Sequence, residues 1–170
     1  MLRLSLMPIL SSAHARREGR AGLRWICLVL LIGLIIQFAL GMILNLYGSI
    51  PAADARASYL QEIETAPGIL TAHALLGLLV LAAAAILLLR AIALRDLTVI
   101  TLVVAGLVAL LGAFAAGEVF VKNGENSASL SMAILTGVAL LCYAGLQAIL
   151  GGQRPLARES AVAHRAEVSS

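Results

Sequence analysis

The sequence predicts an all-α, polytopic membrane protein built as an antiparallel bundle of four transmembrane helices. Of its 170 residues, 61% are hydrophobic and only 12% are charged, whereas soluble domains are usually about 45–50% apolar and about 25% charged. The apolar residues gather into four long runs, each close to the roughly 20 residues that a helix needs to cross a bilayer. The charged residues fall mainly in the tails and the connections between these runs.

The chain begins with a polar, basic segment over residues 1–24. Its short apolar patch, residues 4–10, contains Pro8 and lies at the low end of the length that a secretory signal needs. We therefore expect residues 1–24 to form a disordered cytoplasmic tail and not a cleaved leader.

The first transmembrane helix is predicted over residues 25–46. Within it, Gly33, Gln37 and Gly41 recur every four residues and share one helix face, which favours close packing against another helix. A long outer loop follows over residues 48–68, and its middle is compatible with a short amphipathic helix on the membrane surface.

The second span, predicted over residues 69–89, contains one ionisable side chain, His73. An ionisable group inside a transmembrane helix is energetically costly, so its presence there suggests a functional site. His73 lies four residues before Gly77, which places the two on one helix face. This spacing leaves room beside the imidazole for a flat ligand or for the backbone of another helix.

The third span is predicted over residues 97–121 and the fourth over residues 128–150. The third carries a ridge of small residues at every fourth position, a pattern that favours a tight helix contact. This ridge consists of Ala105, Ala109, Ala113 and Gly117. The charged segment 151–170 is expected to be a second disordered cytoplasmic tail.

Lysine and arginine are distributed unevenly between the two ends of the predicted bundle. The N-terminal tail carries five, the connection between the second and third spans carries two, and the C-terminal tail carries three. The other two loops carry one each, Arg56 and Lys122. By the positive-inside rule, both termini are predicted to be cytoplasmic. The Ala-, Leu- and Arg-rich composition suggests a bacterial protein of the plasma membrane.

Under this orientation, polar residues collect in the outer half of the bilayer. This distribution fits a ligand or redox group near the outer leaflet, and it also fits the general polarity of helix ends. Glu118 either reaches the membrane surface or accepts a hydrogen bond from His73, as the partner of a ligating histidine does. The outer polar residues are Asn45, Thr71, His73, Glu118, Ser127, Ser129, Ser131 and Met132.

Three roles remain open for His73: ligating haem or a metal, tying two helices together by a hydrogen bond, and handling protons or a substrate. A faint internal repeat aligns residues 71–76 with 130–135 and places Met132 opposite His73. Histidine and methionine are a known axial pair for haem iron. If His73 ligates haem, the predicted cofactor is haem b, bound by His73 and Met132 with Gly77 beside the ring; otherwise no cofactor is expected. The surrounding polar residues would be Gln37, Asn45, Glu118 and Ser131.

Three features resemble one four-helix half of the haem A synthase family and, more loosely, other four-helix membrane b-type cytochromes. They are Gln37-x3-Gly41, the long outer loop and Ala72-His73-Ala74-x2-Gly77. In that family each half carries a histidine near the outer end of its second and fourth spans, so the resemblance implies haem ligation by His73. Here Met132 or Ser131 takes the place of the second histidine, and the cysteine pair of the outer loop is missing. These departures argue against haem A synthesis itself.

The sequence thus favours an integral membrane protein that binds haem through His73 near the outer leaflet. The alternative is a non-catalytic accessory subunit or scaffold, whose partners would be respiratory or other membrane-complex subunits or a second copy. No basic stripe is interleaved with aromatic residues, so nucleic acid is not an expected partner. The sequence also lacks a Ser/His/Asp set, a metal-binding cluster and a phosphate loop, which disfavours hydrolytic enzymes. A transporter is disfavoured because no charged residue lies in the middle of a span.

Overall fold

The computed structural model describes residues 7–47, 68–123 and 125–152, with side chains from residue 19 onward. The described chain is helical apart from short connections, and each of its helices contains a stretch long and apolar enough to cross a membrane. This confirms the all-helical class and the membrane-length helices predicted from the sequence. The predicted outer-loop helix and residues 153–170 of the C-terminal tail lie outside the described residues. The helices are α1 (Met7–Tyr47), α3 (Gly68–Leu94), α4 (Leu97–Asn123) and α5 (Asn126–Gly151).

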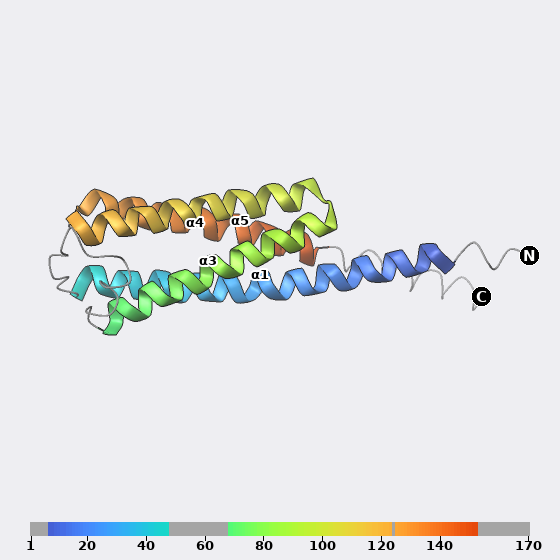
Figure 1. Ribbon diagram of the computed structural model, residues 1–170, viewed down its shortest axis with the longest axis horizontal. Coiled ribbons are helices and arrows are strands. Elements are labelled where there is room, and N and C mark those ends of the chain that lie inside the picture. Colours follow the sequence, from blue (N-terminus) through green and yellow to red (C-terminus); the bar gives the residue numbers. More distant parts are fainter. Residues whose placement is uncertain (1–6, 48–67, 124, 153–170) are drawn as a thin grey trace, which may run out of the picture.

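Helix α1 begins at Met7, well before the start at Trp25 that was expected from the onset of the apolar run. Residues 7–24, expected to belong to a disordered tail, are therefore helical. The physical reason is that hydropathy locates the membrane-compatible part of a helix, whereas alanine, arginine and glutamate also favour helix outside a membrane. Figure 1 shows this part of α1 extending beyond the ends of the other helices.

Each helix packs against two others. Helix α1 contacts α3 and α5, and α4 contacts the same two helices, so α3 and α5 lie diagonally across the molecule. Figure 1 shows the end of α1 and the start of α3 at one end of the molecule, together with the connection between α4 and α5. We call this the outer end, after the predicted orientation. The opposite end, with the α3–α4 turn, is the inner end.

The buried core occupies the inner half of the helices. Most of its residues follow one another at intervals of four and three along each helix, the spacing that keeps a single face turned toward neighbouring helices. Toward the outer end the burial declines, and no described residue of α3 before Val80 is fully buried. Its main members are Leu23, Cys27, Leu30 and Leu34 of α1, Val80, Ala84, Leu87 and Ala91 of α3, Val99, Val103 and Leu110 of α4, and Ala139, Tyr143 and Leu146 of α5.

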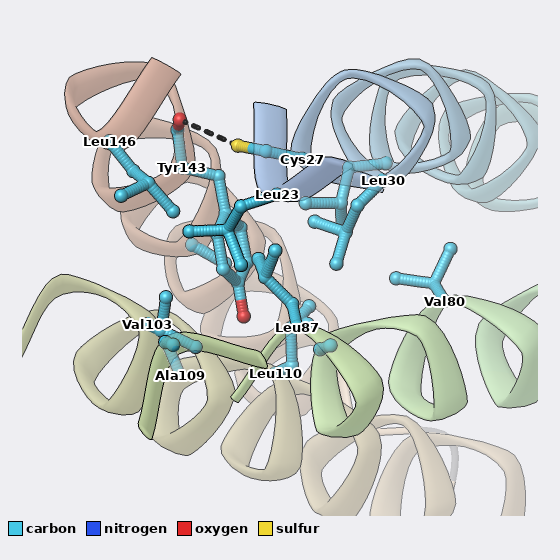
Figure 2. Packing of buried hydrophobic residues seen from close by; sticks show 14 of the residues in the cluster. Leu23, Cys27, Leu30, Val80, Leu87, Val103, Ala109, Leu110, Tyr143 and Leu146 are labelled. Carbon is cyan, nitrogen blue, oxygen red and sulfur yellow. Dashed lines mark hydrogen bonds between the residues drawn. The ribbon is translucent and has the colours of Figure 1, made fainter. Parts of the chain in front are cut away.

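Tyr143 is the largest fully buried side chain of this core. Its ring packs on Gly106 of α4, where a Cβ atom would lie only 2.6 Å from the ring Cζ. Figure 2 shows the ring reaching from α5 into the cluster, while the Cys27 Sγ donates a hydrogen bond of 3.3 Å to the Tyr143 carbonyl oxygen. Tyr143 therefore joins α5 to both α1 and α4.

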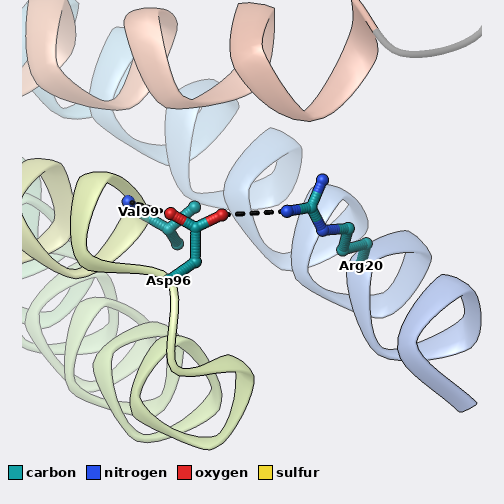
Figure 3. Close-up of polar contacts among 3 residues, drawn as sticks. All are labelled: Arg20, Asp96 and Val99. Carbon is teal, nitrogen blue, oxygen red and sulfur yellow. Dashed lines mark hydrogen bonds and ion pairs between the residues drawn. The ribbon is translucent and has the colours of Figure 1, made fainter. Parts of the chain in front are cut away.

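Asp96 connects three parts of the inner end. It precedes α4, and its Oδ1 accepts a hydrogen bond of 3.4 Å from the backbone N–H of Val99, as an N-cap residue does. Its Oδ2 accepts a hydrogen bond of 2.8 Å from the guanidinium of Arg20 in α1 (Figure 3). One carboxylate thus caps α4 and fixes the α3–α4 turn against α1.

We expect Asp96→Ala to lower the free energy of unfolding by about 1–2 kcal/mol, because the N-cap alone contributes about 1 kcal/mol. The ion pair adds less, since both side chains are 31% exposed. Asp96→Asn retains an oxygen for the cap and should lose less than Asp96→Ala. Thermal unfolding in detergent measures both variants, and equal losses would contradict the capping role.

Candidate functional site

Two of the predicted site residues meet in the outer half, where α1 contacts α3. The Gln37 Nε2 lies 3.2 Å from the His73 Nε2. An amide nitrogen donates hydrogen bonds and does not accept them. In this orientation of the amide, the Nε2 of a neutral imidazole accepts the hydrogen bond, and the ring proton is then on Nδ1. This bond links the two helices through side chains that the sequence placed on separate spans.

Glycines on the facing helices receive these two side chains. A Cβ at Gly41 of α1 would lie 3.1 Å from the His73 Cε1, and a Cβ at Gly77 of α3 would lie 3.0 Å from the Gln37 Nε2. The imidazole thus packs on Gly41, and the amide packs on Gly77. The room predicted between His73 and Gly77 is therefore taken by the side chain of Gln37.

Two buried polar atoms of this pair have no hydrogen-bond partner within the part of the chain that the structure describes. They are the Gln37 Oε1 and the His73 Nδ1. Leaving a buried polar group unpaired costs roughly 1–3 kcal/mol. Unpaired groups of this kind are therefore candidates for binding a ligand, an ion or an ordered water.

Met132 occupies the corresponding position in the pair of helices α4 and α5. A Cβ at Gly117 of α4 would lie 3.2 Å from the Met132 Sδ, which matches the contact of His73 with Gly41. In each pair, a glycine toward the outer end of the first helix receives a side chain from the early turns of the second. This correspondence supports the internal repeat seen in the sequence. His73 packs within the pair α1 and α3, and Met132 packs within the pair α4 and α5.

Glu118 interacts with a residue of its own helix and not with His73. Its carboxylate accepts a hydrogen bond of 2.8 Å from the ammonium of Lys122, one helical turn further along α4, and both side chains are exposed. The predicted hydrogen bond from His73 is not formed, because Nε2 is bonded to Gln37 and Nδ1 has no described partner. In the part of the chain that the structure describes, Glu118 is therefore an exposed partner of Lys122.

The remaining polar residues of the outer end make contacts of their own. The Ser129 hydroxyl donates a hydrogen bond of 3.1 Å to the Asn45 Oδ1, which links α5 to α1. The Ser131 hydroxyl donates a hydrogen bond of 2.9 Å to the carbonyl oxygen of Ser127 within the same helix. Among the described residues, no hydrogen bond therefore links Asn45 or Ser131 to the imidazole.

The small-residue ridge of α4 is largely covered within the molecule. Ala109 and Ala113 are buried, and Gly117 packs on Met132 of α5. A different small-residue surface lies open on α5, where a Cβ at Gly137 or Gly145 would meet no described atom within 4 Å. Leu141 lies between these glycines in the sequence, with its side chain 76% exposed. We call Gly137, Leu141 and Gly145 the open α5 face.

Tyr143 and Gln147 are polar residues of α5 for which no role was predicted from the sequence. The Tyr143 hydroxyl and the Gln147 Oε1 are buried, and neither has a hydrogen-bond partner among the described residues. Their signal in the sequence was their polarity within an apolar helix, at positions four residues apart on one face. Tyr143 is a packing residue of the core, and Figure 2 shows it among the labelled core side chains.

The site is thus a half-buried imidazole–amide pair between α1 and α3, with two buried polar atoms that have no partner among the described residues. Its chemistry allows a hydrogen bond to a ligand or, if Nε2 is released, the binding of a metal ion. The described residues contain no group of three or more His, Cys, Asp or Glu side chains that could hold a metal. The chain has no match among protein-family models, curated proteins or solved structures.

Proposed function

We propose that this is a multi-pass protein of the plasma membrane that binds haem b through His73, in the outer half of an antiparallel four-helix bundle. The matched placement of His73 and Met132 carries the proposal. Each side chain packs on a glycine of its own helix pair, and the two belong to the diagonal helices α3 and α5. An imidazole and a thioether together can ligate haem iron and raise its reduction potential.

The proposed orientation has both termini in the cytoplasm. Its support is the excess of lysine and arginine in the two tails and the α3–α4 turn. The ion pair between Arg20 and Asp96 places the N-terminal part of α1 beside that turn, as a shared cytoplasmic side requires. His73 then lies toward the outer leaflet, away from this charged end.

The residues of the outer half fit a haem in their donor chemistry. The unpaired His73 Nδ1 could donate to a ligand group, and its Nε2 is a nitrogen that could bind iron once it is released from Gln37. Met132 would supply the second ligand after its Sδ leaves Gly117. A bound haem would supply one-electron transfer.

An absorption spectrum tests this proposal. The protein is expressed with added haem, purified in detergent and measured before and after reduction with dithionite. We expect a Soret band and sharpened α and β bands, lost in His73→Ala and shifted in Met132→Ala. Met42→Ala is the matched control, because Met42 is 40% exposed on α1 and has no proposed role. A colourless wild-type protein would contradict haem binding.

The second candidate is a non-catalytic accessory subunit of a larger membrane complex. The open α5 face favours it, because small residues on a lipid-facing surface allow another transmembrane helix to approach closely. Gly137 and Gly145 provide that space on either side of Leu141. The partner would be another subunit, of a respiratory or other membrane complex, or a second copy of this chain. A colourless protein in the spectrum above would favour this candidate.

A further inference from the structure

We infer that Gln37 is a positioning residue that holds His73 in the α1–α3 contact and competes with iron for the imidazole Nε2. The competition rests on the proposed haem function. The positioning rests on the contacts of the two side chains alone. Together they mean that iron can bind the imidazole Nε2 only after Gln37 has moved away from it.

The competition follows from the single lone pair of a neutral imidazole. The Gln37 amide donates to the His73 Nε2 across 3.2 Å, so that nitrogen is already acting as an acceptor. A nitrogen whose lone pair accepts a hydrogen bond cannot bind iron at the same time. The same bond fixes the ring proton on Nδ1. Iron binding through Nε2 therefore requires Gln37 to leave.

Gly77 makes this arrangement of Gln37 possible. A Cβ at position 77 would lie 3.0 Å from the amide nitrogen, closer than such contacts normally are. The amide is therefore seated in the space that glycine leaves on α3. Gln37 contacts α3 through both His73 and Gly77, so it is held more firmly than a lone surface amide would be.

The second proposed ligand has no comparable restraint. The alignment that pairs Gly41 with Gly117 also pairs Gln37 with Ala113, an apolar side chain that is buried. Met132 therefore packs on its glycine without a polar residue in the place of Gln37. Only the histidine must break a side-chain hydrogen bond before it can bind iron. Haem affinity should accordingly depend on residue 37.

The test compares Gln37→Leu with Gln147→Leu. Gln147 is the matched control, because its Oε1 is also buried without a described partner but it lies in the inner half of α5. In a haem titration of the detergent-purified protein, we expect Gln37→Leu to bind about 3–10-fold more tightly than wild type, the effect of one competing hydrogen bond. Gln147→Leu should bind as wild type does. Haem binding by wild type with equal or weaker binding by Gln37→Leu would overturn the competition and leave the proposed function standing.

A second measurement needs no haem. Nitrogen NMR of protein labelled at histidine distinguishes the two tautomers, and His73→Gln identifies the signal of His73. We expect the His73 proton on Nδ1 in wild type and a shift of population toward Nε2 in Gln37→Leu. A wild-type His73 protonated on Nε2, or a spectrum unchanged by Gln37→Leu, would overturn the positioning role. Failure of every variant to bind haem would refute the proposed function and the competition, whereas the tautomer would still decide the positioning.

Discussion

Gly106→Ala is expected to lower the free energy of unfolding by about 2–3 kcal/mol, a large effect for the addition of one methyl group. The new Cβ would lie 2.6, 2.9 and 3.0 Å from three atoms of the Tyr143 ring. That ring is fully buried, and its stiff aromatic atoms are not the end of a flexible chain. Inserting atoms into a well-packed core typically costs about 1–3 kcal/mol. Unfolding in detergent by heat or by titration with a denaturing detergent measures the loss.

Gly137→Ala is the control for Gly106→Ala. Position 137 is also a glycine within a transmembrane-length helix, but a Cβ there would meet no described atom within 4 Å. Alanine is a better helix former than glycine by about 1 kcal/mol, so this variant should be as stable as wild type or more so. Tyr143→Leu should recover part of the loss when it is combined with Gly106→Ala. Equal stability of the two single variants would contradict the contact between Gly106 and Tyr143.

The contrast between these glycines shows what the sequence could not reveal. In a soluble helix, polar residues mark the exposed face and apolar residues mark the buried one. In these helices both faces are apolar, as is expected of helices that cross a membrane, where lipid is as apolar as the core. Gly106 and Gly137 therefore look alike in the sequence, although one receives a tyrosine ring and the other lies open. The four apolar stretches of membrane length could be predicted from composition, whereas the start of α1 and the buried faces of the helices required the structure.

The site was predictable within each helix but not between helices. The spacing of Gln37 and Gly41, and of His73 and Gly77, correctly indicated which residues share a face. It did not indicate that each glycine would receive the polar side chain of the other helix. Distance along the chain carries no information on this point, because the partners come from separate spans. For this reason the space beside His73 was expected to receive a cofactor, whereas in the structure the side chain of Gln37 lies there.

Glu118 forms an ion pair within its own helix and not the hydrogen bond to His73 on another helix that was one of its two expected roles. Lys122 lies four residues further along the same helix, an arrangement that brings opposite charges together without any tertiary contact. The observed ion pair of 2.8 Å between them follows from this spacing. The i, i+4 pattern was present in the sequence and was the better guide to this carboxylate.

Gly41→Val is expected to cost about 2–3 kcal/mol in stability, and Gly117→Val about 1 kcal/mol, although the two glycines occupy equivalent positions in the repeat. In both cases the new Cβ would lie close to a side chain of the facing helix, 3.1 Å from the His73 Cε1 or 3.2 Å from the Met132 Sδ. The imidazole is planar, and its hydrogen bond to Gln37 resists displacement. The methionine side chain is unbranched and flexible, so it can rearrange around the added atoms. Both estimates follow from the general cost of overpacking.

Unfolding of the two variants in the same detergent measures this difference directly. Gly41→Val should regain stability when His73→Ala is added, because the smaller side chain removes the overlap. Met132→Ala should have little such effect on Gly117→Val, where the overlap is already relieved by flexibility. Equal losses in the two single variants would mean that the imidazole moves as freely as the thioether. In that case the hydrogen bond from Gln37 would not be holding the ring in place.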